Sequence, residues 1–234
     1  DLHSFPTRRS SDLFVMNQKS AATPETVLLA LLAYQNLCVA ESLFGYSGPR
    51  PELSARLPLG RLGAEVLSRF TRMCDAIPGG QQAALAAIQP LTSPVDEFVT
   101  ITTPKARGER MLRLLFVTHL ELELIQRLRV EELEPAAAEA IGTDAGLWQV
   151  IDHTSLTVLS VLGTNQRVCG ELSTYARRML GEAAVVGQRL LVREPALRVL
   201  LTGDRDDQMT RSSAALGELL SAVSARLSQL GLSM

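Results

Sequence analysis

The sequence lacks the patterns that identify several common functional classes. Its three cysteines, Cys38, Cys74 and Cys169, show no Cys-x-x-Cys spacing. They therefore predict neither a zinc site nor a disulfide framework, and they suit reduced thiols in a cytoplasmic protein. The formal net charge is only −2, which gives no electrostatic support for nucleic-acid binding. No Gly-rich phosphate loop, nucleophile elbow or Ser/His/Asp order stands out.

Strand patterns and long apolar runs are also missing. The chain has 234 residues and is 46% hydrophobic, enough for a sizeable core in one large domain or two small ones. Leu, Ala, Glu and Arg dominate without sustained alternation, which predicts an all-α protein. The apolar stretch 27–40 is interrupted by Gln35 and Asn36 and is too short to span a membrane, so no membrane association is predicted.

The first residues do not read as part of a fold. Residues 3–13 read HSFPTRRSSDL, which is what one reading frame of a common sequencing-adapter oligonucleotide encodes. We therefore interpret residues 1–13 as adapter-derived and exclude them from fold reasoning. Arg8 and Arg9 are accordingly not interpreted as a nucleic-acid patch or as a twin-arginine signal.

The remainder predicts a series of helices with clear start and stop signals. Thr23 is an N-cap followed by Pro24 and Glu25, which begin a helix that ends near Phe44. Proline and glycine mark most of the other boundaries. Long helices with further C-terminal ones predict a bundle with additions. The expected helices after the first cover 57–77, 81–89, 93–102, 104–134, 143–163, 164–192, 195–201 and 209–230.

Four segments together resemble a known family. They are Leu31–Leu37, the spaced pattern Phe98-x-x-x-Thr102-x-Pro104-x-x-x-x-Glu109, Tyr175–Ala183 and Arg226–Leu232. Over residues 25–232 the chain resembles an actinobacterial ferritin-like family described as tRNA-(2-methylthio-N6-hydroxyisopentenyl-adenosine) hydroxylase-like. The resemblance implies a ferritin-like four-helix bundle with additional C-terminal helices, formed by residues 14–234 as a single domain. It also implies a di-iron centre between four helices.

Most positions that match the family's metal ligands carry other residues here. Glu65 and Glu123 keep a carboxylate, and His153 replaces an expected Asp. The remaining positions, expected to be a Glu and two His, are Asn36, Ser68 and Leu156. If the match is right, all of these residues converge on one point between the helices.

Such a ligand set is too poor for a di-iron centre, which needs roughly four carboxylates and two imidazoles. Glu65, Glu123 and His153 are the residual candidates for metal binding, and no cofactor is expected. His119 lies one helical turn before Glu123, so an improvised His/Glu pair is a lesser candidate. Tyr34 and Trp148 are expected to fill core space with their polar edges satisfied.

Three functions remain open at this point. The first is a non-catalytic binding or structural protein whose di-iron site is degenerate, paired with itself as a homodimer or with a related ferritin-like protein as a heterodimer. The second is an active di-iron oxygenase or hydroxylase acting on modified tRNA, which rests on the resemblance alone. The third is an unrelated all-α regulator, such as the ligand-binding part of a repressor.

Overall fold

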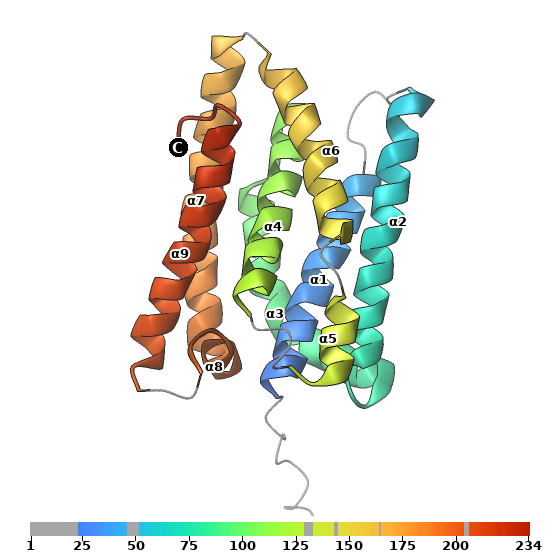
Figure 1. The fold of residues 1–234 in the computed structure, drawn as a ribbon, viewed down its shortest axis with the longest axis vertical. Coiled ribbons are helices and arrows are strands. Elements are labelled where there is room, and N and C mark those ends of the chain that lie inside the picture. Colours follow the sequence, from blue (N-terminus) through green and yellow to red (C-terminus); the bar gives the residue numbers. More distant parts are fainter. Residues whose placement is uncertain (1–22, 46–51, 129–132, 143–144, 164, 204–205) are drawn as a thin grey trace, which may run out of the picture.

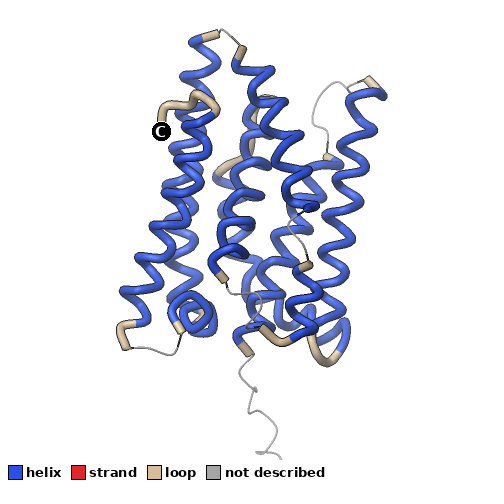
Figure 2. Tube along the Cα trace, in the orientation of Figure 1, coloured by secondary structure: helices blue, strands red, loops and turns tan. Residues whose placement is uncertain are grey.

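A computed structural model describes residues 23–45, 52–128, 133–142, 145–163, 165–203 and 206–234. These residues form helices joined by turns and loops, and no strand occurs among them (Figure 2). The all-α prediction is therefore confirmed for the described chain. The predicted adapter-derived segment lies outside the described residues.

Two pairs of long helices form the central bundle. Helix α1 (Pro24–Phe44) packs along α2 (Leu53–Ala76), and α4 (Arg107–Arg127) packs along α6 (Ala145–Leu162) (Figure 1). Gly108 permits the second pairing, because a Cβ there would lie 2.9 Å from Val161 Cγ1. Helix α3 (Gly80–Ile101) joins α2 to α4 and contacts α1, while the short α5 (Pro135–Ile141) contacts α2.

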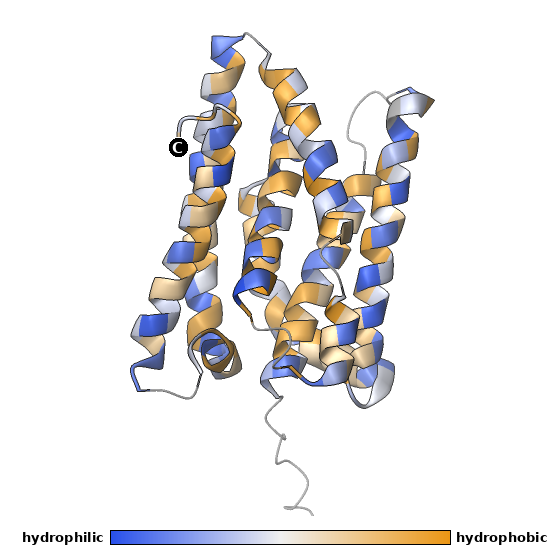
Figure 3. Ribbon diagram, viewed as in Figure 1, coloured by the Kyte–Doolittle hydropathy of each residue, from blue (hydrophilic) through white to orange (hydrophobic). Residues whose placement is uncertain are grey.

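The C-terminal helices form an added layer beside this bundle. Helices α7 (Gln166–Arg193) and α9 (Gln208–Gln229) lie side by side at the edge opposite α2, with α8 (Pro195–Thr202) at one end (Figure 1). Hydrophilic residues are spread along α2 and α9 at the two edges (Figure 3). The predicted architecture, a four-helix bundle with C-terminal additions, is confirmed.

The first helix begins and ends as predicted. Thr23 Oγ1 accepts a hydrogen bond from the Thr26 amide, and the helix continues to Phe44. Helix α1 has 21 residues, and its most apolar 18-residue window has a mean hydropathy of 1.6, so it is long and apolar enough to cross a membrane by length and composition. The expectation that this segment is too short was therefore wrong. Because 56% of its most apolar window is buried inside the bundle, the composition of α1 suits a core helix.

Other predicted boundaries were wrong because prolines that were expected to begin or end helices lie inside them. Helix α2 begins at Leu53, and Pro58 lies inside it. The segments expected at 81–89 and 93–102 form one helix, α3, which contains Pro90 and Pro94. Its buried residues recur at a helical spacing, so a continuous apolar face offsets the hydrogen bonds that the prolines remove. These residues are Ala84, Ile88, Leu91, Pro94 and Phe98.

The region between α4 and α6 also differs from expectation. Helix α4 ends at Arg127, well before the predicted end near residue 134. Residues 135–141, for which no element was predicted, form α5. Pro135 occupies the first helical position, where its missing N–H removes no intrahelical bond.

A buried ion pair at the centre of the bundle

An arginine and a glutamate form an ion pair inside the four-helix bundle. Arg69 Nη2 of α2 lies 3.1 Å from Glu121 Oε1 of α4, and only 2% and 1% of the two side chains are exposed. Charged residues are almost never buried this completely unless they are paired. The pair therefore marks the one place where α2 and α4 bring opposite charges into the core among the described residues.

Two amides from α1 complete the hydrogen bonding of the carboxylate. Asn36 Nδ2 donates to Glu121 Oε1 at 2.8 Å, and Gln35 Nε2 donates to Glu121 Oε2 at 3.3 Å. Asn36 Oδ1 in turn accepts from Arg69 Nε at 3.4 Å. Arg69 Nη1 donates to the Ile141 carbonyl at the end of α5, at 3.0 Å. Four helices thus hold one polar cluster, which we call the Arg69–Glu121 cluster.

Helical spacing explains why these residues point inward. The buried face of α2 recurs at intervals of three and four residues, and Arg69 occupies a position on it where an apolar residue is expected. The members of that face are Leu59, Leu62, Val66, Arg69 and Met73. Helix α6 approaches closely here, because a Cβ on Gly146 would lie 3.8 Å from Arg69 Cδ and 3.3 Å from Glu65 Cγ.

The electrostatics of the cluster balance desolvation against pairing. Burial raises the pKa of Glu121, and this effect exceeds the opposing influence of the Arg69 charge and of the hydrogen bonds from Asn36, Arg69 and Gln35. Because burial disfavours its ionised form, the Glu121 carboxylate depends on the Arg69 guanidinium for a counter-charge. The cluster therefore supplies its own positive charge at the centre of the bundle.

The sequence-predicted positions do not converge as expected. Glu65 is exposed and lies 4.0 Å from Arg72 in a surface ion pair, and Ser68 is also exposed. Leu156 is 69% exposed on α6. Of the expected positions only Asn36 joins the cluster. The inward pair on α2 is Val66 and Arg69, one residue further along than the predicted Glu65 and Ser68.

Glu123 and His153 lie apart from the cluster. Glu123 accepts a hydrogen bond from Arg226 Nε of α9 at 2.9 Å, and the Arg226 guanidinium sits 5.6 Å from the Trp148 ring centroid. Trp148 is 37% exposed rather than a core residue. His153 is half-buried on α6, where burial and then Arg107 lower its pKa. The predicted register on α4 was wrong, since Glu121 rather than Glu123 is the interior carboxylate.

Two further polar groups are buried on α4 beside these residues. His119 is 5% exposed, and neither its Nδ1 nor Thr118 Oγ1 has a hydrogen-bond partner among the residues that the structure describes. Burial lowers the pKa of His119 to about 4; the Arg226 charge acts in the same direction and Glu123 opposes it. The imidazole is therefore neutral at neutral pH. It shares one helix face with Glu123, as its spacing predicts.

The residues at the centre do not fit a di-iron group. The Arg69–Glu121 cluster offers one carboxylate, two amides and a guanidinium, which is a cation with no lone pair to donate. Within the described residues, no group of three or more His, Cys, Asp or Glu side chains could hold a metal ion. Glu65, Glu123 and His153 are thus not brought together, and metal binding by any of them stays a prediction.

The arrangement of α1, α2, α4 and α6 defines a ferritin-like helical bundle. A family model described as a ferritin-like domain of actinomycetes matches residues 22–204, and the chain belongs to that family. The match covers the central bundle, α7 and α8, whereas α9 follows it. No curated protein matches the chain.

Sequence reasoning missed both members of the ion pair. The signal for Arg69 was available, since it falls on the same spacing as Leu62, Val66 and Met73. Glu121 was recognisable only by comparing both faces of α4, where its neighbours Thr118, Leu122 and Ile125 are also buried. The metal-ligand positions implied by the family resemblance fall on Glu65, Ser68 and Glu123 instead.

Proposed function

We propose that this chain is a non-catalytic binding or structural protein of the tRNA hydroxylase-like group within its ferritin-like family, with a degenerate di-iron site. The Arg69–Glu121 cluster carries the proposal. A metal centre in such a bundle places cations among buried carboxylates. Here the Arg69 guanidinium neutralises the one carboxylate that is buried within the described part of the chain, so this carboxylate has a counter-charge without a metal ion.

Iron loading of the full chain tests this function. We expect purified protein supplied with ferrous iron, desalted and analysed by elemental mass spectrometry, to retain far less than the roughly two irons per chain of a di-iron bundle. A content near two, with an absorbance change that depends on oxygen, would overturn the proposal. The same result would favour the alternative, a di-iron hydroxylase acting on modified tRNA.

A pair of variants tests whether the interior register is the one that matters. Val66→Glu with Arg69→His places Glu-x-x-His on the buried face of α2, opposite Glu121. The matched control, Ser68→His, creates the same spacing with Glu65 on the exposed face. We expect the interior variant to gain more tightly held divalent metal than the control, because only it adds ligands beside a buried carboxylate. Equal metal retention by both variants would contradict the register.

A further inference from the structure

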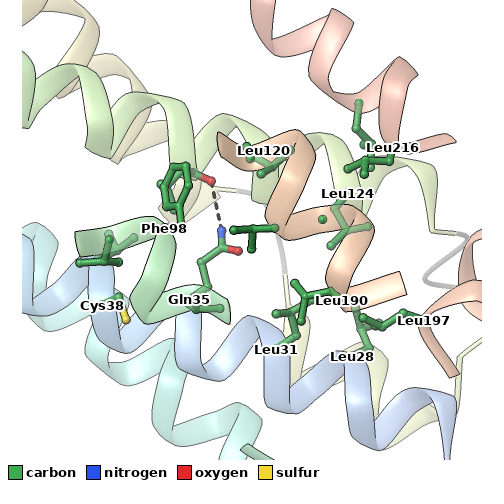
Figure 4. Close-up of a pocket in the computed structure, with 18 of the residues that line it drawn as sticks. Leu28, Leu31, Gln35, Cys38, Phe98, Leu120, Leu124, Leu190, Leu197 and Leu216 are labelled. Carbon is green, nitrogen blue, oxygen red and sulfur yellow. Dashed lines mark hydrogen bonds between the residues drawn. The ribbon is translucent and has the colours of Figure 1, made fainter. Parts of the chain in front are cut away.

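An apolar cavity lies between the central bundle and the added C-terminal layer. It has a volume of about 170 Å³ and is lined from α1, α3, α4, α7, α8 and α9. Figure 4 shows leucines from several helices pointing into it, among them Leu31, Leu120, Leu124 and Leu190. An engineered cavity of about 150 Å³ in another protein holds one benzene molecule. By that comparison, this cavity has room for roughly seven carbon atoms.

The cavity is elongated along one face of α1. Leu28, Leu31, Gln35, Cys38 and Ser42 all line it, and their spacing places them on a single stripe of the helix. In Figure 4, Leu28 lies beside Leu197 at one end, and Cys38 lies near Phe98 at the other. A narrow space of this shape fits a linear alkyl chain better than a compact ring.

The positively charged side chain of the cavity lies at one end of this stripe, whereas the amide of Gln35 lies in its middle. Ser42 and Arg113 line the cavity at the end away from α8, where Arg113 Nη2 donates to Ser42 Oγ at 3.4 Å. Arg113 Nη1 donates to the Val99 carbonyl at 3.1 Å near the end of α3. The side chain is half-buried, and no carboxylate is among its ion-pair or hydrogen-bond partners in the described chain.

The electrostatic surroundings of the Arg113 guanidinium suit an anionic ligand. Burial lowers its pKa, and nearby Arg110 acts in the same direction, whereas the nearby Tyr175 and Cys38 side chains oppose this. Glu41 and Asp96 act on Cys38, where their charges add to the effect of burial in raising the thiol pKa to about 11. A half-buried guanidinium that lacks a carboxylate partner gains a charge-assisted, bidentate interaction when a ligand supplies one.

We propose that the cavity binds one medium-chain fatty acid, with its alkyl chain among the leucines and its carboxylate against Arg113. The inference rests on the proposed role as a binding protein and supplies the class of ligand. It does not depend on the iron content of the bundle. Gln35 separates the two features, since it lines the cavity while its Nε2 donates to Glu121.

Calorimetric titration of the full chain with octanoate and octanol tests the proposal. Octanoate has seven carbons beyond its carboxyl group, about the capacity of the cavity. We expect saturable binding at one site, with octanoate binding more tightly than octanol. Arg113→Gln should weaken octanoate by roughly 10- to 100-fold, the range for one lost charge-assisted hydrogen bond, and change octanol by less than about threefold. Absent octanoate binding, or equal effects on both ligands, would overturn the proposal.

A cavity-filling variant locates the binding. Leu120→Trp places an indole in the cavity and should abolish binding of both ligands, whereas Leu159→Trp, on an exposed position of α6, should leave both unchanged. Unchanged binding in Leu120→Trp would refute the site. If that variant does not fold, the wild-type melting temperature decides, because a ligand of the folded state raises it as its concentration exceeds Kd. No shift with saturating octanoate overturns the proposal, while iron loading tests the proposed function separately.

Discussion

Removing the positive member of the buried ion pair should unfold the protein at a much lower denaturant concentration. Arg69→Met keeps most of the side-chain volume but leaves the Glu121 carboxylate in the core without a counter-charge. Breaking a buried pair in this way costs about 3–5 kcal/mol at neutral pH. For a chain of this size, that loss corresponds to a melting temperature lower by roughly 6–20 °C.

The pH dependence of this variant has a defined sign. Burial already raises the pKa of Glu121, and loss of Arg69 removes an influence that lowers it. The folded state then binds a proton more strongly than the unfolded state, so stability falls as pH rises through the interval above the unfolded pKa. We therefore expect Arg69→Met to regain stability between pH 7.5 and pH 5, measured by urea unfolding at both values.

Two further variants serve as controls for Arg69→Met. Arg72→Met, one turn along the same helix, breaks a half-exposed pair with Glu65 and should cost less than about 1 kcal/mol. Arg69→Met with Glu121→Gln removes both charges while keeping an amide for Asn36, and should recover most of the loss at pH 7.5. A double variant as unstable as Arg69→Met would refute the argument that the unpaired carboxylate causes the loss.

Further substitutions test other parts of the structure. Burial lowers the pKa of His119 to about 4. The stability that its neutral form contributes is therefore fully present above the unfolded pKa of about 6.5 and is lost as pH falls from that value toward the folded pKa. His119→Gln should show a smaller drop in melting temperature between pH 7 and pH 5 than the wild type. Tyr175→Phe removes the buried hydroxyl that donates to the Thr102 carbonyl and should lower the unfolding free energy by about 1–3 kcal/mol in urea titrations. Gly187→Ala places a Cβ 2.7 Å from Leu216 Cδ2; since both residues line the cavity, the leucine can rotate into it, so calorimetry should show weaker octanoate binding with a stability change within about 1 kcal/mol.

Local signals were sufficient for most of the helices. Thr23 caps α1, and Asn165 caps α7 by accepting from the amides of Arg167 and Val168. These boundaries depend on residues a few positions apart, which the sequence places next to one another. The exceptions involve packing between helices. The apolar face of α3 packs across two prolines, and α5 contacts α2 where no element was predicted. Helix α2 begins earlier, and α4 ends earlier, than their local signals indicate.

The position of the cluster could not be obtained in the same way. Adjacent helical residues differ by about 100° in direction, so Ser68 faces solvent while Arg69 enters the core. The alternation of leucine and glutamate around Glu121 and Glu123 left the inward member of α4 equally undecided. The predicted metal register was therefore off by one residue on α2 and by two on α4.

Periodicity, caps and motifs in the sequence predict an all-helical chain, most of its helix boundaries and its family resemblance. Which polar residues meet depends on how the helices pack. Arg69, Glu121 and Asn36 are more than 30 positions apart, and only the packing of α1, α2 and α4 brings their charges and amides into one buried cluster. The cavity also depends on tertiary packing, because it lies where the side chains of six helices leave space between them.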